Sequence, residues 1–121
     1  TVIVTTPQNV SISDCRKGIE MIKKLSIPII GLIENMSWFQ PEDLNKKYFL
    51  FGKDGGKDLA AEYKISLLAQ LPLIEKKDKK ELHDLGQLKT SFEALTVKII
   101  ELIKSIRSKT VDSIPQMNVT K

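Results

Sequence analysis

Pro28-Ile-Ile-Gly-Leu-Ile-Glu-Asn-Met-Ser-Trp-Phe39 decides the fold of this chain, because an unbroken apolar run passes directly into a polar step at Glu34 and Asn35. An apolar run without alternation is typical of a parallel strand that is buried on both faces. In open α/β sheets, ligands bind outside the carboxyl ends of the strands. An amide there can bind the edge of a base, since it carries both donors and an acceptor. The stretch therefore predicts an α/β fold with Asn35 at a binding edge.

Two other segments have the same plan, an apolar run stopped by a polar turn or a proline. Val2-Ile-Val4 leads into Thr5-Thr-Pro-Gln8, and residues 65–71 lead into Pro72 and Leu73. We expect both runs to be strands of the same sheet. Because parallel strands have their carboxyl ends at one edge, the residues that follow them are expected to share a crevice.

Helical periodicity fills the segments between these strands. A first helix is expected to start near Ser11 or Ser13, whose hydroxyls suit a cap, and its apolar face is Cys15, Ile19, Met21, Ile22 and Leu25. Gly55-Gly56 is expected to open a second helix with Leu59, Ala60 and Tyr63 turned inward. Thr90 with Glu93 forms a capping box before an amphipathic stripe of Phe92, Leu95, Ile99, Leu102, Ile103 and Ile106.

The order of these elements is strand, helix, strand, loop, helix, strand, helix, which favours a doubly wound parallel sheet. We therefore expect residues 1–106 to form one α/β unit with helices flanking the sheet. Residues 107–121 lack periodicity and are expected to be a disordered tail. Thr1 stands inside a predicted strand without an initiator Met, so we expect that it is not the natural N-terminus.

Composition narrows the classes of function. The chain has 121 residues, of which 41% are hydrophobic and 28% charged, and this balance is typical of a globular domain. The net charge is +4, but the lysines are spread along the chain without interleaved aromatic residues, so no nucleic-acid partner is expected. No apolar run approaches the roughly 18 residues of a membrane span. The single cysteine excludes an internal disulfide and fits a reducing compartment.

Five segments in order, residues 2–8, 17–21, 27–39, 49–60 and 67–73, resemble the C-terminal half of the Mrp/ApbC-type P-loop ATPases. This MinD-like family is linked to iron–sulfur cluster carriage and assembly. The resemblance implies the C-terminal half of a MinD-like P-loop NTPase domain that binds Mg-ATP. It also implies a cytoplasmic homodimer that exchanges clusters with recipient or scaffold proteins.

The resemblance carries the adenine site to three residues. In related ATPases an asparagine after the second strand and the residues after the next strand's proline surround the adenine. By resemblance these positions are Asn35, Pro72 and Leu73. The alternative for Asn35 is a local cap in a strand-end turn.

Other parts of the family machinery are missing from this sequence. The segment Gly52–Asp58 imitates a phosphate loop, but Phe51 stands where the first glycine belongs and Asp58 where a hydroxyl should hold Mg²⁺. We expect a helix-start turn there and no ATPase activity from this chain. The family's cluster-binding cysteine pair falls on Pro41 and Leu44, which cannot ligate iron, so no cluster is expected in this segment.

Two residue types outside these motifs have simpler interpretations. Cys15 is expected as a small buried thiol on a helix. His83, the only histidine, has no nucleophile pattern near it and is expected to be solvated. Two alternative functions stay open: a non-catalytic α/β interaction module or remnant, and a MinD/ParA-like positioning ATPase. The second would need a membrane-targeting helix or a DNA-binding patch.

Overall fold

The computed structural model describes residues 1–41, 45–74 and 86–113, with side chains for residues 1–41, 45–74 and 89–108. Its elements in chain order are β1 (Val2–Thr5), α1 (Asn9–Lys24), β2 (Gly31–Glu34), α2 (Gly55–Glu62), β3 (Leu67–Gln70) and α3 (Gly86–Ser113). None of the helices in the described residues is both long and apolar enough to cross a membrane.

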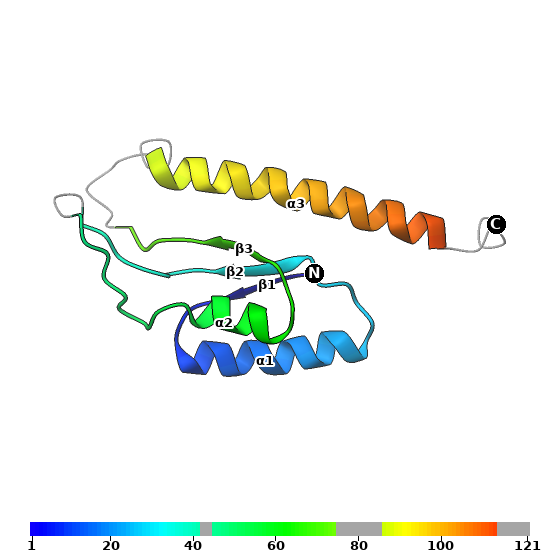
Figure 1. Cartoon of the computed structure of the whole chain (residues 1–121), viewed down its shortest axis with the longest axis horizontal. Helices are drawn as coiled ribbons and strands as arrows, with labels where there is room; N and C mark the ends of the chain where they lie inside the picture. Colours follow the sequence, from blue (N-terminus) through cyan, green and yellow to red (C-terminus); the bar gives the residue numbers. More distant parts are fainter. Residues whose placement is uncertain (42–44, 75–85, 114–121) are drawn as a thin grey trace.

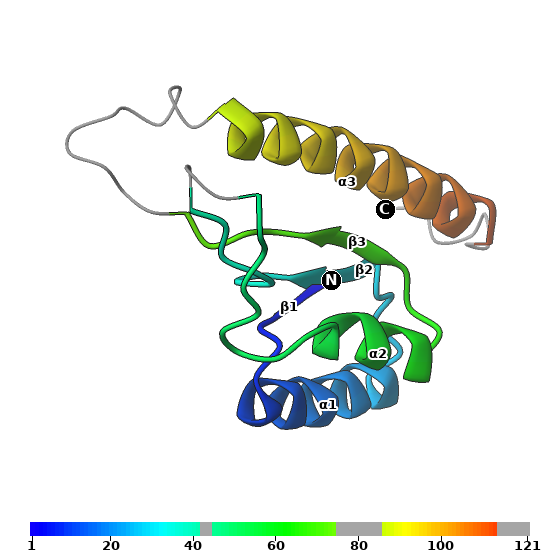
Figure 2. The ribbon, with the colours of Figure 1, turned by 60° about the vertical axis from the view of Figure 1, so that its left-hand side comes forward.

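The three strands form one parallel sheet in the order β1-β2-β3. Helices α1 and α2 cover one face, and α3 covers the other (Figures 1 and 2). The expectation of an α/β fold with a parallel sheet flanked by helices is confirmed. All four residues of β2 are buried. This agrees with the prediction from its unbroken apolar run, which is typical of a parallel strand covered on both faces.

The core has two layers, one on each face of the sheet. On the side of α1 and α2, the buried residues are Ile3, Ile19, Leu32, Leu59 and Ala60. On the side of α3, they are Ile33, Leu68, Leu71 and Leu95. Successive residues alternate between these layers in β1 (Val2 and Ile3) and in β2 (Leu32 and Ile33), which is the two-residue period of a strand.

Gly31 lets β2 approach β3 closely. A Cβ at this position would lie 2.5 Å from Leu68 Cγ and 2.8 Å from the Ser66 carbonyl oxygen. Both distances are too short for real contacts, so only glycine fits here without a shift of β3. The register between β2 and β3 also shifts between Leu32 and Ile33.

The start and the apolar face of α1 differ from the expectation. The helix begins at Asn9 after Gln8, so Ser11 and Ser13 are not caps. Ser11 Oγ instead accepts from Thr6 N at 3.0 Å, because a hydroxyl inside the first turn can still reach the loop that enters the helix. The apolar face is also narrower than predicted, since two of its expected members, Met21 (59%) and Leu25 (62%), are exposed.

Helix α3 is longer than the predicted amphipathic stripe. It begins at Gly86, so Thr90 lies inside the helix and the capping-box prediction is wrong. It also continues past residue 106, the boundary predicted for the domain, to Ser113. Residues 114–121, the rest of the predicted tail, lie outside the described residues.

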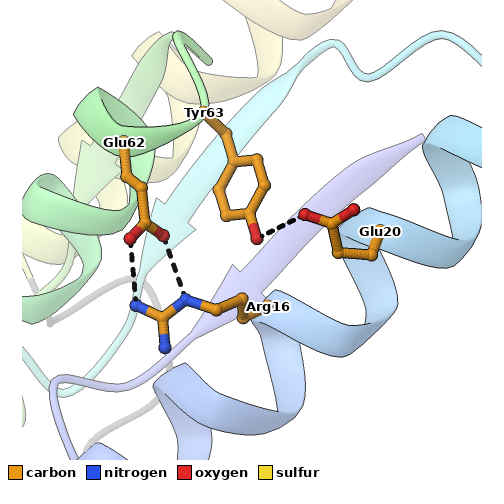
Figure 3. A network of polar contacts seen from close by, with 4 residues as sticks. All are labelled: Arg16, Glu20, Glu62 and Tyr63. Carbon is orange, nitrogen blue, oxygen red and sulfur yellow. Dashed lines mark hydrogen bonds and ion pairs between the residues drawn. The ribbon is translucent and has the colours of Figure 1, made fainter.

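A polar network joins the outer faces of α1 and α2 (Figure 3). Arg16 donates from Nε to Glu62 Oε2 at 3.0 Å, and Tyr63 Oη donates to Glu20 Oε1 at 2.8 Å. The hydrogen bond and charge of Glu62 raise the pKa of Arg16, while partial burial and then Glu20 raise the pKa of Tyr63. Both pKa shifts favour the cationic guanidinium of Arg16 and the neutral phenol of Tyr63.

The burial of α1 predicts how two substitutions on this helix change stability. Ile19 is fully buried, and Ile19→Ala should lower the free energy of unfolding by about 2–5 kcal/mol through lost burial and a cavity. Met21→Ala, two residues later and largely exposed, should change it by less than about 0.5 kcal/mol. Urea denaturation followed by circular dichroism measures both. Equal losses from the two substitutions would contradict the packing described here.

Candidate functional site

The carboxyl ends of all three strands meet at one edge of the sheet, because the strands are parallel. Asn35 follows β2 directly, and Pro72 and Leu73 follow β3 after Leu71. All three predicted adenine residues therefore lie at this edge, hereafter the carboxyl edge. Asn35, Pro72 and Leu73 are each partly buried, so part of each side chain is accessible.

The chain leaves β2 through a bulge that carries Asn35. Leu71 N donates to the Glu34 carbonyl at 2.8 Å, and Ser37 N donates to the Leu71 carbonyl at 2.9 Å. In an unbroken parallel ladder residue 36 would make the second bond, so this segment holds one extra residue. Met36 takes a left-handed conformation with φ of 55° to accommodate it. The bulge turns the segment out of the ladder directly after β2.

Asn35 is held by its backbone and by one side-chain oxygen. Its N–H donates to the Thr5 carbonyl at 2.7 Å, and its Oδ1 accepts from Met36 N at 2.9 Å. Among residues 1–41, 45–74 and 89–108, whose side chains are described, no group accepts from its Nδ2. The oriented amide thus offers two N–H donors to a ligand. The same Oδ1 contact also fits the alternative of a local turn residue.

Leu73 is fixed beside the returning chain. Its N–H donates to the Trp38 carbonyl at 2.7 Å, so residues 37–39 run alongside residues 71–73 beyond the strand ends. This extension keeps Pro72 and Leu73 in place without making them part of a strand. They present an apolar surface at the same edge as the Asn35 amide.

A buried carboxylate underlies the carboxyl edge. Glu34 is 0% exposed, and its Oε2 accepts from Gly56 N at the start of α2. Its Oε1 accepts from Gln70 Nε2 at 3.1 Å, and the same nitrogen donates to Asp54 Oδ1 at 2.9 Å. A negative charge is favourable at a helix N-terminus, so Glu34 caps α2 from a different element. Asp54, the residue before the helix, forms no cap with its own side chain.

The pattern of the sequence around Glu34 predicts a polar step after the strand but not this contact with the start of α2. The sequence does indicate that Glu34 needs hydrogen-bond partners, because a charged side chain directly after an unbroken buried run is costly to bury without them. The partners, Gly56 and Gln70, stand 22 and 36 residues away. Nothing in the local pattern identifies them.

The segment that imitates a phosphate loop is a helix-start turn, as predicted. Helix α2 begins at Gly55, after Gly52 with φ of 105° and Asp54 with φ of 58°. A Cβ on Gly55 would lie 2.8 Å from the Pro7 carbonyl oxygen, so this loop packs directly on the segment between β1 and α1. The Glu34 carboxylate already occupies the helix N-terminus. It would repel a phosphate there.

The other positions predicted from the sequence are Pro41, Leu44, His83 and Cys15. Pro41 lies two residues after Phe39, which exchanges backbone hydrogen bonds at 2.7 Å with Tyr48. Leu44 and His83 are outside the described residues. Cys15 packs against the core on the α1 side. Within the described part of the chain, no three Cys, His, Asp or Glu side chains gather as a metal site.

Comparison with known proteins identifies the family. A family model described as ParA, NUBPL iron-transfer P-loop NTPase, matches residues 1–110. The chain belongs to this family. The resemblance inferred from the five segments is thereby confirmed.

Individual relatives agree with the family. An iron–sulfur cluster carrier protein of Pseudomonas fragi is 46% identical over 72 residues, which are 60% of this chain and 25% of the relative. A carrier of the same description from Methanocaldococcus jannaschii is 49% identical over 72 residues, again 60% of this chain and 25% of the relative. The mouse iron–sulfur cluster transfer protein NUBPL is 40% identical over 86 residues, 71% of this chain and 26% of the relative. The chain thus spans about a quarter of these relatives.

A solved structure is similar as well. It is a nucleotide-binding protein from Archaeoglobus fulgidus in complex with ADP, with a TM-score of 0.51 and 28% identity. The match covers 78% of this chain and 35% of that one. The chain therefore shares its α/β arrangement with part of a nucleotide-binding protein.

The contact between Gly56 and Glu34 predicts opposite effects for two glycine substitutions. A Cβ on Gly56 would lie 2.8 Å from Glu34 Oε2 and 2.9 Å from Glu34 Cβ, so Gly56→Ala should lower the free energy of unfolding. Gly18 lies in α1 with nothing within 4 Å of an added Cβ. Gly18→Ala should raise the free energy of unfolding by about 0.5–1 kcal/mol, because alanine has a higher helix propensity than glycine.

Chemical denaturation of the parent and both variants measures the two changes. Because both substitutions add one methyl group to a helix, the Gly18 variant controls for the intrinsic preference of alanine. A stabilising Gly56→Ala would show that Glu34 does not lie against the start of α2.

Proposed function

We propose that this chain is the adenine-binding, C-terminal half of an ATP-dependent iron–sulfur cluster carrier. The observation that carries the proposal is the bulge after β2, which holds the Asn35 amide at the same edge of the sheet as Pro72 and Leu73. Membership in an iron-transfer P-loop NTPase family and the similarity to an ADP-bound protein support it.

The residues at the carboxyl edge fit the base of ATP. Asn35 Nδ2 would donate to a ring nitrogen of adenine, and Oδ1, which already accepts from Met36 N, would accept from the exocyclic amine. Pro72 and Leu73 would lie against the apolar face of the ring. The chain thus supplies binding and orientation of the nucleotide. Phosphates and Mg²⁺ would be held by groups that this sequence does not contain, since it has no phosphate-loop motif.

The cargo is an iron–sulfur cluster, which a complete protein would pass to recipient or scaffold proteins. In this proposal the complete protein works as a homodimer in the cytoplasm, where a single unpaired Cys15 stays reduced. Pro41 and Leu44 offer no thiolate, so the cluster would be held by residues outside the segment 37–51.

A second candidate function is a non-catalytic interaction module. One observation favours it: the start of α2, the nearest imitation of a phosphate loop, is occupied by the Glu34 carboxylate. In this case the sheet and helices would persist for docking without nucleotide binding. The two functions differ in whether Asn35 contacts adenine.

A chimera separates them. In the Pseudomonas fragi carrier, the 72-residue region that matches this chain is replaced by the corresponding residues of this chain. Asn35→Ala in the chimera should weaken ATP binding about fivefold, since one hydrogen bond contributes about 1 kcal/mol. It should weaken GTP binding less, because guanine presents a different edge. Asn45→Ala, an exposed asparagine in the following loop, is the matched control.

Isothermal titration of the parent chimera and the two variants with ATP and GTP gives the six affinities. An Asn35→Ala chimera that binds both nucleotides like its parent would make Asn35 a turn residue and favour the interaction module. A chimera that binds ATP and loses affinity only through Asn35→Ala would support the adenine site.

A further inference from the structure

The outer surfaces of α1 and α2 form a shallow hollow of about 460 Å³. Its lining residues are Arg16, Lys17, Glu20, Met21, Lys24 and Tyr63. All but Tyr63 belong to α1, and Tyr63 directly follows α2. Because α1 and α2 cover the same face of the sheet (Figures 1 and 2), this chain itself supplies both walls. We call this feature the α1–α2 hollow.

The polar network between the two helices fixes the walls of the hollow (Figure 3). Tyr63 reaches from the end of α2 and donates from Oη to Glu20 Oε1 at 2.8 Å. Arg16 donates from Nε and Nη2 to the two carboxylate oxygens of Glu62 at 3.0 and 3.4 Å. Lys23 Nζ lies 5.2 Å from the centre of the Tyr63 ring, within cation–π distance. The carboxylates of Glu20 and Glu62 are therefore already bound by groups of this chain.

Two lysines of the hollow have no such partner. Among the residues whose side chains the structure describes, neither Lys17 nor Lys24 forms an ion pair. Both lysines are exposed on α1. Together with Arg16 they give the lining three positive charges against the one carboxylate of Glu20. The α1–α2 hollow therefore attracts anionic groups.

An exposed methionine lies between these two lysines. Lys17, Met21 and Lys24 are four and three residues apart, so all three lie on one face of α1. Met21 is 59% exposed, and a flexible thioether adapts well to an apolar side chain. The helix rises about 10 Å from Lys17 to Lys24. An extended peptide covers this distance in about three residues.

We propose that the α1–α2 hollow docks an extended acidic segment of a partner protein, in which two carboxylates about three residues apart flank an apolar side chain. The carboxylates would pair with Lys17 and Lys24. The apolar side chain would lie on Met21, beside the Tyr63 ring. The inference does not rest on nucleotide binding, since no residue of the predicted adenine site lines the hollow.

The same features argue against other occupants. A second copy of this chain, docked through the same hollow about a two-fold axis, would bring its lysines toward those of the first copy. A flat lipid surface would touch the rim of the hollow and not its walls. The phosphates of a nucleic acid would meet the Glu20 carboxylate in the lining. An acidic segment with one apolar residue uses both the charge of the lysines and the exposed thioether.

Nuclear magnetic resonance of the isotope-labelled 121-residue chain tests the proposal, because this method detects weak binding and locates it. The probe is a synthetic peptide with a central leucine between two pairs of glutamates. Its addition should shift the amide signals of Lys17, Met21 and Lys24 and leave those of α3 in place. A peptide with lysines in place of the glutamates should not bind. A peptide with serine in place of the leucine should bind about threefold more weakly.

Two double variants of equal charge separate docking at the hollow from general attraction. Lys17→Glu with Lys24→Glu should weaken binding of the glutamate peptide about tenfold or more, because two attractive charge pairs become repulsive. Lys98→Glu with Lys104→Glu is the matched control, since both lysines are exposed on α3, on the opposite face of the sheet (Figure 1). Met21→Ala, which should leave the fold intact, should weaken binding about threefold.

Dispersed spectra like that of the parent show that each variant is folded. The proposal is wrong if the glutamate peptide does not bind, if both double variants bind it equally, or if the signals of α3 shift in place of those of α1. Binding that is unchanged by Met21→Ala and by serine in the peptide would contradict the apolar contact. Displacement of the peptide by anionic vesicles or by an oligonucleotide that binds more tightly would assign the hollow to that ligand instead.

Discussion

The contact between the buried Glu34 carboxylate and the first turn of α2 is the interaction on which the carboxyl edge depends. A carboxylate with no exposed surface is stable only where donors satisfy it. Here a helix N-terminus and the Gln70 amide supply those donors. One side chain therefore fixes the end of β2, the start of α2 and the end of β3 relative to one another. This arrangement also explains the glycine at position 56, because no Cβ fits against the carboxylate.

The groups that the carboxyl edge offers to a ligand depend on these contacts of Glu34. With β2 fixed, the extra residue of the bulge turns the chain at Met36. It leaves Asn35 with one anchored oxygen and with an amide nitrogen that has no acceptor among the described residues. The same carboxylate makes the turn before α2 a poor place for phosphate. The edge is thus built for a neutral, planar, hydrogen-bonding group and not for an anion. This character fits the base of a nucleotide whose phosphates are bound by another part of the domain.

Much of the fold could be predicted from the sequence, because its determinants are local. The apolar run into Asn35 predicted a parallel strand and its exit, and Gly55-Gly56 predicted the start of α2. The helix caps were predicted less well. The hydroxyl of Ser11 serves the entering loop, and α3 begins before Thr90. Such errors arise because a residue suited to a cap is equally stable one turn inside the helix when it finds another partner.

The position of the candidate site could be predicted from the sequence, but the contacts that hold its residues in place could not. Strand ends are local features, so Asn35, Pro72 and Leu73 could be assigned to one edge from order alone. The Glu34 contacts join residues far apart in the sequence, and only the fold brings them together. The place of β1 at an edge of the sheet in the described residues could not be predicted for a similar reason, since an apolar run in the sequence does not show which neighbour covers it.

Amide hydrogen exchange at Gly56 tests the central contact most directly. In the 121-residue chain, the Gly56 N–H should be protected as strongly as the β2 amides. In Glu34→Gln, the added side-chain nitrogen must face either Gly56 N–H or Gln70 Nε2, which are both donors. Protection of Gly56 should then fall at least tenfold, since hydrogen bonds to charged groups contribute about 1.5–3 kcal/mol. A Gly56 amide that exchanges freely in the parent, or equally in both proteins, would contradict the account.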